Sequence, residues 1–574
     1  MIGSRHRPGD YVLAIDLGTG GPKVALLSPS GEILACISRC ISTTFLPGGG
    51  AEQYPEEWWH AIVDATRAVL NTPGIDPKKV VGIGCTAQWS GTVACDVNGE
   101  PLRPAIIWMD SRGSANVKDQ VSGFPSIMGY HIPKIIRWIH LTGGAPGISG
   151  KDPLGHILWI RQHEPVVYSR TYKFLEPIDW IDMKLTGIAS ASHDSICLHW
   201  VTDNRDIHNI RYSEKLLEMS GIEPSKLPGL VPSGSVMGHL STQAATELGL
   251  PEGVPVATGS GDVHSAVIGS GAIDDFDLHL YIGTSSWISC HVPFKKTDGL
   301  HNIASIPSAL SGRYLVANEH ETAGACLDFL ASTLLGGVDT TTANDRHHKE
   351  VKTHLGKQVS TGDRRDAVSR NADTGLVAPA PPSYTRSDLR IPKHFYEYTE
   401  QAASRAAPGS RGVVFTPWLN GERSPVDDHT IRGGFHNLSL STTQDDMIRS
   451  VYEGVAFNSR WLLESVESFT GRRCKELTFI GGGARSRLWA QIHADILQRR
   501  VIPLHDPVLA NVRGAGILAV LALGMITRDD IAGMVTRDAP LEPDSRASTT
   551  YDGIYREFVN IYRKNRKIYR RLNA

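Results

Sequence analysis

The chain has 574 residues, a formal net charge of −2 and charged side chains at 21% of its positions. This length exceeds what one hydrophobic core normally serves, so we expect two or more domains. The lack of a basic surplus argues against nucleic acid as a partner. The eight cysteines form no CxxC pair and no His/Cys cluster, which favours a reducing compartment and argues against a zinc site.

Three segments bear on membranes and nucleic acid as partners. Residues 1–10 are polar and lack the apolar core of a signal peptide, and the apolar stretch 514–526 is too short to span a bilayer. Residues 551–572 are basic, with aromatic side chains at helical spacing. This pattern favours an amphipathic helix packed on a domain over an arm that binds nucleic acid or a membrane. We expect a cytoplasmic protein with neither partner, and the sequence leaves a homodimer open.

A glycine-rich turn joins the first two predicted strands. Residues 11–16 (YVLAID) form a β run, the turn GTGG occupies 18–21, and residues 24–27 form the next run. Backbone N–H groups and a hydroxyl in such a turn can hold phosphate oxygens. Asp16 offers one carboxylate to a hydrated Mg²⁺, and Lys23 adds positive charge. An ordinary hairpin turn is the alternative, and the chain contains no GxxxxGK[ST] motif.

The second half of the chain contains a similar strand-turn-strand unit. Residues 278–282 form a β run, the turn GTSS follows at 283–286, and a further β run occupies 287–292. Two strand-turn-strand units suggest a duplicated architecture with a cleft between its halves. Strands and helices alternate between them, as at 58–70 and 80–85, which predicts an α/β fold.

Polar and aromatic residues follow two further predicted strands, at 80–85 and 105–107. Strand ends of this kind are where open α/β sheets bind ligands. An amide, an indole, a carboxylate and a guanidinium suit a polyhydroxylated molecule that needs several oriented hydrogen bonds. A surface Asp–Arg pair beside a core tryptophan is the alternative. The candidate ligand contacts are Gln88, Trp89, Ser90, Asp110 and Arg112.

Asp262 is the strongest single candidate for chemistry. The apolar run 255–257 leads into a glycine turn, and Asp262 stands where the following helix begins. Glycines at 259 and 261 allow the backbone to approach a ligand closely. A carboxylate in this position suits a general base that takes a proton from an alcohol. A helix N-cap is the alternative, because aspartate is a favoured capping residue.

Two later segments differ from the rest of the chain. Three glycines at 481–483 separate the β run 477–480 from an amphipathic helix at 488–497, which leaves room for a flat ligand or a phosphate chain. Residues 336–387 are polar, mixed in charge and end in a proline-rich run. We interpret this second segment as a surface insertion.

These pieces, in this order, resemble the FGGY carbohydrate kinases. The matching segments include residues 417–425 (PWLNGERSP), 481–497 (GGGARSRLWAQIHADIL) and 258–262 (TGSGD). The resemblance implies an α/β fold of two actin-like, ribonuclease H-like domains with an interdomain cleft. It also implies phosphorylation of a small-molecule sugar or polyol with ATP and Mg²⁺. The implied division is an N-terminal domain at 11–272, a C-terminal domain at 273–525 and a helical extension at 526–574.

The resemblance also implies roles for individual residues. Asp262 falls where the family carries its catalytic aspartate, Asp16 would lie near the metal, and the candidate ligand contacts named above would bind the sugar, together with Asp262. Residues of the two glycine-rich turns and of the late glycine run would bind ATP. These are Gly18, Thr19, Lys23, Gly283, Thr284, Ser285, Gly481, Gly482, Gly483 and Ala484.

The sequence departs from the family pattern at two places. His156 stands where the family's P-x-x-K motif has lysine, so we assign it no role. The family's xylulose kinases typically show G-Q-M-H-G where this chain has AQWSG at 87–91, so Trp89 and Ser90 should reshape the sugar pocket. Pentulose kinases are the most similar members. The alternatives are a kinase for a tetrulose, a hexulose, glycerol or another polyol, or a sensor of sugar or nucleotide without catalysis.

Overall fold

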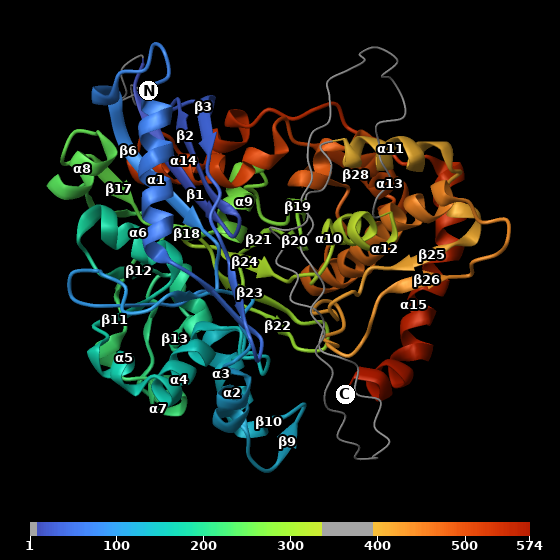
Figure 1. Ribbon diagram of the computed structural model, residues 1–574, viewed down its shortest axis with the longest axis horizontal. Coiled ribbons are helices and arrows are strands. Elements are labelled where there is room, and N and C mark those ends of the chain that lie inside the picture. Colours follow the sequence, from blue (N-terminus) through green and yellow to red (C-terminus); the bar gives the residue numbers. More distant parts are fainter. Residues whose placement is uncertain (1–8, 336–393, 574) are drawn as a thin grey trace, which may run out of the picture.

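The computed structural model describes residues 9–335 and 394–573. The predicted insertion at 336–387 lies outside these residues. Figure 1 shows two lobes of mixed α/β structure side by side, the first formed mainly by the N-terminal half of the chain and the second mainly by the C-terminal half. Each lobe has its own central sheet, and the two sheets begin in the same way.

The first lobe is built around a seven-stranded sheet that opens with an antiparallel meander. The pair Gly18–Gly21 ends the ladder between the first two strands, so the predicted glycine turn closes over two residues. The strand Val80–Ala87 lies parallel to the first strand, and the strand Pro255–Ala257 lies parallel to Val80–Ala87. The strands are β1 (Tyr11–Gly18), β2 (Gly21–Leu27), β3 (Ile33–Ser38), β6 (Val80–Ala87), β17 (Pro255–Ala257), β16 (Val236–His239) and β18 (Ser260–Gly261), which pairs with β6.

Helices cover both faces of this sheet, because the side chains of β1 alternate between them. Leu13 and Ile15 pack in the cluster that contains Trp58 of α1 (Pro55–Leu70). Ala14 points the other way and packs against α14 (Ala510–Ala522). Small residues on this second face let α14 lie close, since a Cβ on Gly84 would sit 2.2 Å from the carbonyl oxygen of Ala515. A helix from the C-terminal part of the chain, α14, therefore completes the first lobe.

The segment between β6 and β17 adds a mostly helical layer to the first lobe (Figure 1). Its elements, with the two small strands that precede β6, are β4 (Thr44–Leu46), β5 (Gly50–Gln53), β7 (Val93–Cys95), β8 (Ala105–Ile106), α2 (Ser114–Val121), β9 (Ser126–Ile127), β10 (Tyr130–His131), α3 (Ile132–Thr142), α4 (Pro153–His163), α5 (Pro165–Arg170), β11 (Lys173–Leu175), α6 (Pro177–Thr186), β12 (Ser190–Ser192), β13 (Thr202–Asp203), β14 (Arg211–Tyr212), α7 (Glu214–Ser220), β15 (Gly229–Val231) and α8 (Thr242–Leu248).

The second lobe repeats the strand-turn-strand start of the first. β19 (Leu278–Ile282) and β20 (Ser286–Ser289) are antiparallel around the turn at 283–285, and β27 (Glu476–Ile480) lies parallel to β19. β28 (Arg500–Pro503) follows β27 in parallel. The remaining elements are β21 (His291–Val292), β22 (Thr297–Asp298), β23 (Ile303–Pro307), β24 (Tyr314–Ala317), α10 (Ala325–Phe329), α11 (Phe395–Arg405), β25 (Val414–Thr416), β26 (Gly434–His436) and α13 (Arg487–Leu497).

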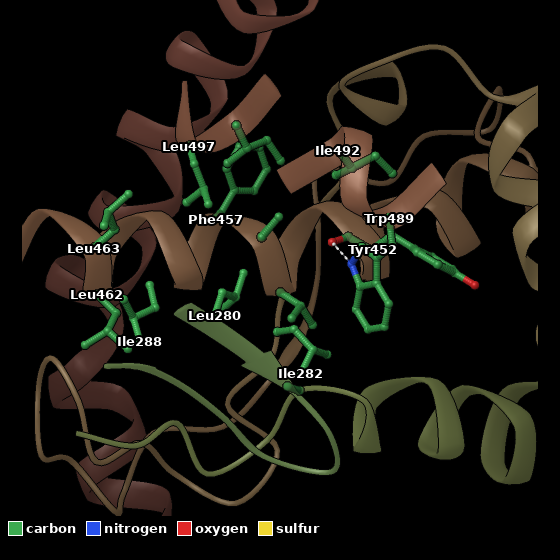
Figure 2. Close-up of a cluster of buried hydrophobic side chains, with 14 of the residues drawn as sticks. Leu280, Ile282, Ile288, Tyr452, Phe457, Leu462, Leu463, Trp489, Ile492 and Leu497 are labelled. Carbon is green, nitrogen blue, oxygen red and sulfur yellow. Dashed lines mark hydrogen bonds between the residues drawn. The ribbon is translucent and has the colours of Figure 1, made fainter. Parts of the chain in front are cut away.

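The core of the second lobe forms where α12 (Gln444–Thr470) crosses the central sheet (Figure 2). Thr443 caps this helix through a reciprocal capping box with Asp446. Leu280 of β19 is fully buried in this cluster. The indole of Trp489 donates a hydrogen bond of 3.0 Å to the backbone oxygen of Tyr452, which joins α13 to α12. The polar atom of the largest side chain here is therefore satisfied, and its ring fills the core.

The two lobes are joined where α9 (Asp262–Gly269) crosses α14. The backbones meet through glycine, because a Cβ on Gly269 would lie 1.8 Å from the oxygen of Ala510 and a Cβ on Gly514 would lie 1.9 Å from the oxygen of Ser265. One buried apolar cluster includes residues of both helices and of both lobes. This crossing holds the end of β18, and with it Asp262, against the second lobe.

The chain ends in a long helix, α15 (Ser545–Asn573), as the aromatic spacing predicts. Tyr551 and Phe558 are fully buried, and both rings lie against Phe457 of α12. Charged side chains occupy the opposite face, which explains the high basic content of this segment. No helix of residues 9–335 or 394–573 is long and apolar enough to cross a membrane.

Candidate active site

The turn between β1 and β2 carries an ion pair. Asp16 and Lys23 face each other across the two strands, and the ammonium of Lys23 donates to Oδ2 of Asp16 at 3.0 Å. The charge of Asp16 is the main cause of the raised pKa of Lys23. Oδ1 of Asp16 is buried and has no hydrogen-bond partner within the described residues. One carboxylate oxygen is therefore left for a ligand, as a cation with few protein contacts requires.

Asp262 lies at the same edge of the sheet as Asp16. Asp16 pairs with Thr86 of β6 on one side, and Ser260 pairs with Thr86 on the other. The Thr86 hydroxyl donates to the oxygen of Ser260 at 2.9 Å, which fixes the strand end two residues before Asp262. Three neighbouring strands thus present both carboxylates at one edge, the site type expected for an open sheet.

The surroundings of Asp262 favour a proton acceptor that works near neutral pH. The side chain is half-buried. Burial, and after it the charges of Asp16 and Glu319, raise the pKa of Asp262 to about 7. Gly261 occupies the N-cap of α9 without a capping side chain, and Asp262 is the first helical residue. Asp262 is therefore not the N-cap, although its Oδ1 accepts from the N–H of Val263 in the first helical turn at 2.9 Å.

A buried carboxyl fixes the glycine turn that leads to Asp262. The N–H of Gly259 donates to Oδ2 of Asp182 at 2.7 Å, and the Ser192 hydroxyl donates to the oxygen of Gly259 at 3.0 Å. Both partners come from the segment that contains α6 and β12. Burial raises the pKa of Asp182 to about 8. A Cβ on Gly259 would meet Ile178 at 2.3 Å, which explains the glycine.

Gln88 and Thr19 belong to one hydrogen-bonded network. Thr19 accepts from the indole of Trp108 at 3.0 Å and donates to Oε1 of Gln88 at 3.1 Å. The amide of Gln88 donates to Gln53 at 2.7 Å. The predicted phosphate turn and the predicted sugar segment are therefore in direct contact. The buried side chain of Gln88 thus holds Thr19 and Gln53 in place.

Trp89 and Ser90 form the wall beside Asp262. The indole of Trp89 donates to the oxygen of Ser195 at 3.0 Å, and its ring packs edge-on against His264 with centroids 5.1 Å apart. A Cβ on Gly261 would lie 3.0 Å from the Trp89 ring, so the ring lies directly against the turn before Asp262. Ser90 has a left-handed backbone with φ of 66° and donates to the oxygen of Lys151 at 2.9 Å.

Asp110 and Arg112 form an ion pair, as one of the two interpretations of the sequence suggests, but Asp110 is buried and Arg112 is half-buried. The guanidinium of Arg112 lies 2.6 Å from Oδ2 of Asp110 and 2.5 Å from Oε1 of Glu52. It also stacks over the ring of Trp159 at 4.0 Å. Most of the bonding capacity of both residues is used within this cluster, which stiffens the wall of the candidate sugar site.

The turn between β19 and β20 is shaped by glycines. A Cβ on Gly283 would lie 2.5 Å from the hydroxyl of Tyr281. Gly481 has φ of 86°, and a Cβ there would lie 2.5 Å from the oxygen of Ile282, whereas Gly482 has no atom nearer than 4.0 Å. The predicted ATP residues of the second lobe therefore lie together, with open space above Gly482. Burial, and after it the charges of Asp262 and Asp16, raise the pKa of Tyr281, whose hydroxyl borders Gly283.

The late glycine run precedes the helix, as the sequence predicts. Gly481 is the N-cap of a 3₁₀ turn at Gly482–Arg485, and α13 begins at Arg487, capped by Ser486. Thr284, Ser285 and Ala484 lie in the two segments just described, next to Gly283 and Gly483. His156 is buried and neutral, because burial lowers its pKa to about 4, and its Nδ1 lies 3.1 Å from the Thr92 hydroxyl.

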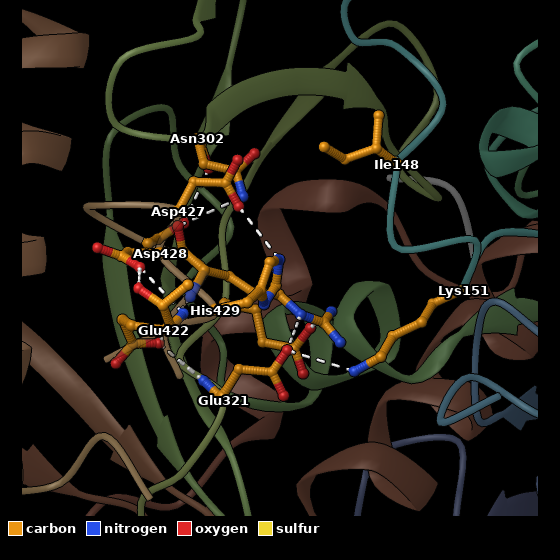
Figure 3. Close-up of polar contacts among 12 residues, drawn as sticks. Ile148, Lys151, Asn302, Glu321, Glu422, Asp427, Asp428 and His429 are labelled. Atoms are coloured by element: carbon orange, nitrogen blue, oxygen red, sulfur yellow. Dashed lines mark hydrogen bonds and ion pairs between the residues drawn. The ribbon is translucent and has the colours of Figure 1, made fainter. Parts of the chain in front are cut away.

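A group of charged residues that the sequence did not single out lies between the lobes (Figure 3). Arg423 pairs with Glu319 and Glu321 of the second lobe, and Lys151 of the first lobe lies 3.5 Å from Glu321. Arg423 is the arginine of the segment PWLNGERSP, which was the one available signal. No group of three or more His, Cys, Asp or Glu in the described part of the chain could hold a metal ion.

Comparison with known proteins decides the family. The N-terminal domain of the FGGY family of carbohydrate kinases matches residues 11–269, and its C-terminal domain matches residues 314–523. The chain belongs to the FGGY family of carbohydrate kinases. It is an enzyme that phosphorylates a small-molecule sugar with ATP as co-substrate.

Named relatives of this FGGY kinase span nearly its whole length. A xylulose kinase of Staphylococcus epidermidis is 26% identical over 580 aligned positions, covering 97% of this chain and 98% of the relative. A gluconokinase of Bacillus subtilis is 25% identical over 560 positions, covering 96% of each. The crystal structure of a ligand-bound xylulose kinase from Lactobacillus acidophilus is 20% identical, with a TM-score of 0.78 over 98% of this chain and 100% of that chain. The predicted fold of two actin-like domains is confirmed.

Proposed function

We propose that this kinase transfers the γ-phosphoryl group of ATP to a hydroxyl of a ketose, with a pentulose such as xylulose as first candidate and Asp262 as general base. The observation that carries the proposal is the position of Asp262. It lies at one sheet edge with Asp16, against the wall formed by Trp89, and close to the glycine turn of the second lobe.

In the proposed mechanism, Asp262 accepts the proton of the substrate hydroxyl, most simply a terminal primary one. The oxygen attacks the γ-phosphorus, the bond to the bridging oxygen breaks, and ADP leaves. Phosphoryl transfer needs positioning and charge neutralisation more than covalent chemistry. Lys23 lies beside Asp16 and contributes positive charge at the first turn. Closure of the two lobes excludes water from the phosphoryl group.

The residues present fit ATP and Mg²⁺. The unpartnered Oδ1 of Asp16 is a suitable ligand for Mg²⁺, which prefers oxygen and keeps most of its waters. Mg²⁺ supplies positive charge to the phosphate oxygens when it is bound there. Backbone N–H groups at Gly18, Thr19, Thr284 and Ser285 would hold phosphate oxygens, whereas the N–H of Gly283 donates to the backbone oxygen of Ser285 at 2.9 Å and so shapes the turn. The space above Gly482 would take the adenosine, with Gly481, Gly483 and Ala484 around it.

The sugar would lie between Asp262 and the Trp89–Ser90 wall. Gln88, Asp110 and Arg112 are bonded to other protein groups, so we assign them mainly to shaping this pocket, with their remaining capacity for hydroxyl groups. The names of the relatives make xylulose the first substrate to test and gluconate the second. A tetrulose, a hexulose and glycerol follow as substrates to test, and a sensor without turnover is the competing function. For the domains we propose the division 11–272, 273–525 and 526–574.

The first experiment is ADP release from MgATP against a panel of ketopentoses, ketotetroses, hexuloses, gluconate, glycerol and pentitols. We expect turnover on one member, which would name the substrate class. Silence across the panel while ATP still binds would contradict the proposal and favour a sensor.

The pocket wall provides a second prediction. Replacing Trp89 with Met and Ser90 with His introduces the side chains typical of xylulose kinases. We expect this double variant to change the ratio of kcat/KM between two sugars by about tenfold, since pocket shape typically contributes about 1–3 kcal/mol to discrimination. The KM for ATP should stay within about twofold, because neither residue belongs to the second turn. An equal loss on every sugar would show that both residues serve folding instead.

A further inference from the structure

The charged group between the lobes contains four residues from distant parts of the chain. Lys151 lies in the loop between α3 and α4 of the first lobe, Glu319 and Glu321 follow β24, and Arg423 follows β25. Nε of Arg423 and Nζ of Lys151 lie 2.6 Å and 3.5 Å from the same oxygen, Oε1 of Glu321. Figure 3 shows the side chain of Lys151 extending from its loop in the first lobe toward Glu321. We call these four residues the interlobe bridge.

The charges of the bridge make Glu321 its centre. Burial alone would raise the pKa of Glu321, but the charges of Arg423 and Lys151 lower it to about 2, so it is ionised at neutral pH. Burial and the charge of Arg423 lower the pKa of Lys151. Two cations share one carboxylate, and the pair is stable only while Glu321 stays between them.

The side of the bridge in the second lobe is rigid. The N–H groups of Glu321 and Arg423 both donate to Oε1 of Glu422, at 2.9 and 3.0 Å, and the amide of Asn458 donates to its Oε2 at 2.6 Å. The Glu321 side chain is only 3% exposed, whereas that of Lys151 is 19% exposed and has a flexible stem. Within the bridge, the ion pair with the longest distance is the one between Lys151 and Glu321, and it is also the one that joins the two lobes. It is the ion pair among several contacts between the lobes, which also include hydrogen bonds from Lys295 to the backbone oxygens of Ile139 and His140 at 2.8 Å.

Both ends of the bridge lead to the candidate active site. The backbone oxygen of Lys151 accepts from Ser90 of the pocket wall at 2.9 Å. At the other end, Glu319 accepts a hydrogen bond from Ser285 of the turn between β19 and β20. Burial raises the pKa of Glu319, and this hydrogen bond opposes the rise. Glu319 also raises the pKa of Asp262. The sugar wall, the base and the phosphate turn are thus connected through one set of ion pairs.

We propose that Lys151 is a positioning residue, which holds the lobes together through Glu321 and so places the Ser90 wall opposite the second turn. It acts through Glu321 and not on the reacting atoms. Removing its charge leaves the sheets and helices intact but widens the angle between the lobes. The substrate hydroxyl is then held less firmly between Asp262 and the second turn.

The structural test uses the ligand-free protein and does not depend on the substrate. Small-angle X-ray scattering is measured for the wild type, Lys151→Met, Lys151→Arg and the control Lys184→Met. Lys184 matches Lys151 in exposure, at 15%, and pairs with Glu100 at 3.0 Å within the first lobe. We expect a larger radius of gyration for Lys151→Met alone, because arginine can still reach Glu321. Scattering of Lys151→Met identical to the wild type overturns the proposal.

The kinetic test rests on the proposed function, because it uses the best sugar of the panel. For Lys151→Met we expect the KM for that sugar to rise about tenfold while kcat changes less than about threefold, with Lys151→Arg close to the wild type. An unchanged KM, or a loss of kcat that arginine fails to restore, overturns the proposal. If the wild type phosphorylates no sugar, the proposed function fails and the scattering result alone decides the role of Lys151.

Discussion

The two strand-turn-strand units of this kinase have the same topology and different chemistry. In each, an antiparallel pair surrounds a Gly-Thr turn, and a parallel strand lies on the other side of the first strand, β6 in the first lobe and β27 in the second. The first unit carries the Asp16–Lys23 ion pair and the hydroxyl of Thr19. The second is defined by glycines packed against Tyr281 and Ile282. The first supplies charge, and the second supplies space for backbone contact.

This difference shows how one architecture serves two tasks. A charge near the proposed base must be placed to within a fraction of an ångström, and the ladder between β1 and β2 fixes the position of Asp16. A nucleotide is bound over a larger surface, where the absence of side chains matters more than any one of them. The first two predictions below remove the charge of the first unit or the space of the second. The third uses the pH dependence of kcat/KM to distinguish the effects of the two units.

Removing the charge of the first unit should have the largest effect. We expect Asp16→Asn to lower kcat by about 100-fold or more, in the range seen when one electrostatic contact to a transition state is lost. The fold should survive, because asparagine can still accept from Lys23. The measurement is kcat at saturating sugar with thermal unfolding as control. A variant with more than half of the wild-type kcat would show that Asp16 is not near the phosphoryl group.

Removing space from the second unit should have a smaller and different effect. In Gly481→Ala, a backbone region that is essentially restricted to glycine costs about 1–3 kcal/mol, and the new Cβ also meets the oxygen of Ile282 at 2.5 Å. We expect a lower melting temperature and a KM for ATP raised at least tenfold. Gly482→Ala is the matched variant, since its Cβ enters open space. It should melt like the wild type and raise only the KM for ATP, and equal melting of both variants would refute this account of the turn.

The pH dependence of kcat/KM should show the smallest effect and should distinguish the two units. The base must be unprotonated, so kcat/KM rises with pH through the pKa of Asp262, about 7, and is flat above it. The nearby charges of Asp16 and Glu319 both raise this pKa. Asp16→Asn should therefore shift the acidic limb to lower pH, whereas Gly482→Ala should leave it in place. An acidic limb that does not move in Asp16→Asn would indicate another titrating group.

The local elements of this site could be predicted from the sequence, and the contacts between distant segments could not. Glycines that interrupt β runs mark both turns, and a carboxylate at the end of an apolar strand marks Asp262. These signals lie within a few residues of one another. By contrast, Lys151, Glu321 and Arg423 meet only because two lobes face each other, and no local pattern encodes that. Their residue types are ordinary for a solvated surface.

One further difference has the same origin. Asp110 and Arg112 are separated by one residue and suggest a surface pair. Their burial depends on Glu52 and Trp159, which come from other parts of the first lobe.

The most direct test of the central claim is the turnover number of Asp262→Asn on the best sugar of the panel, with ATP binding and melting temperature measured on the same preparation. The account predicts a folded variant that binds ATP like the wild type and loses about 10²–10⁴-fold in kcat, the contribution typical of a positioned general base. A folded variant that keeps most of its turnover would contradict it and place the base elsewhere.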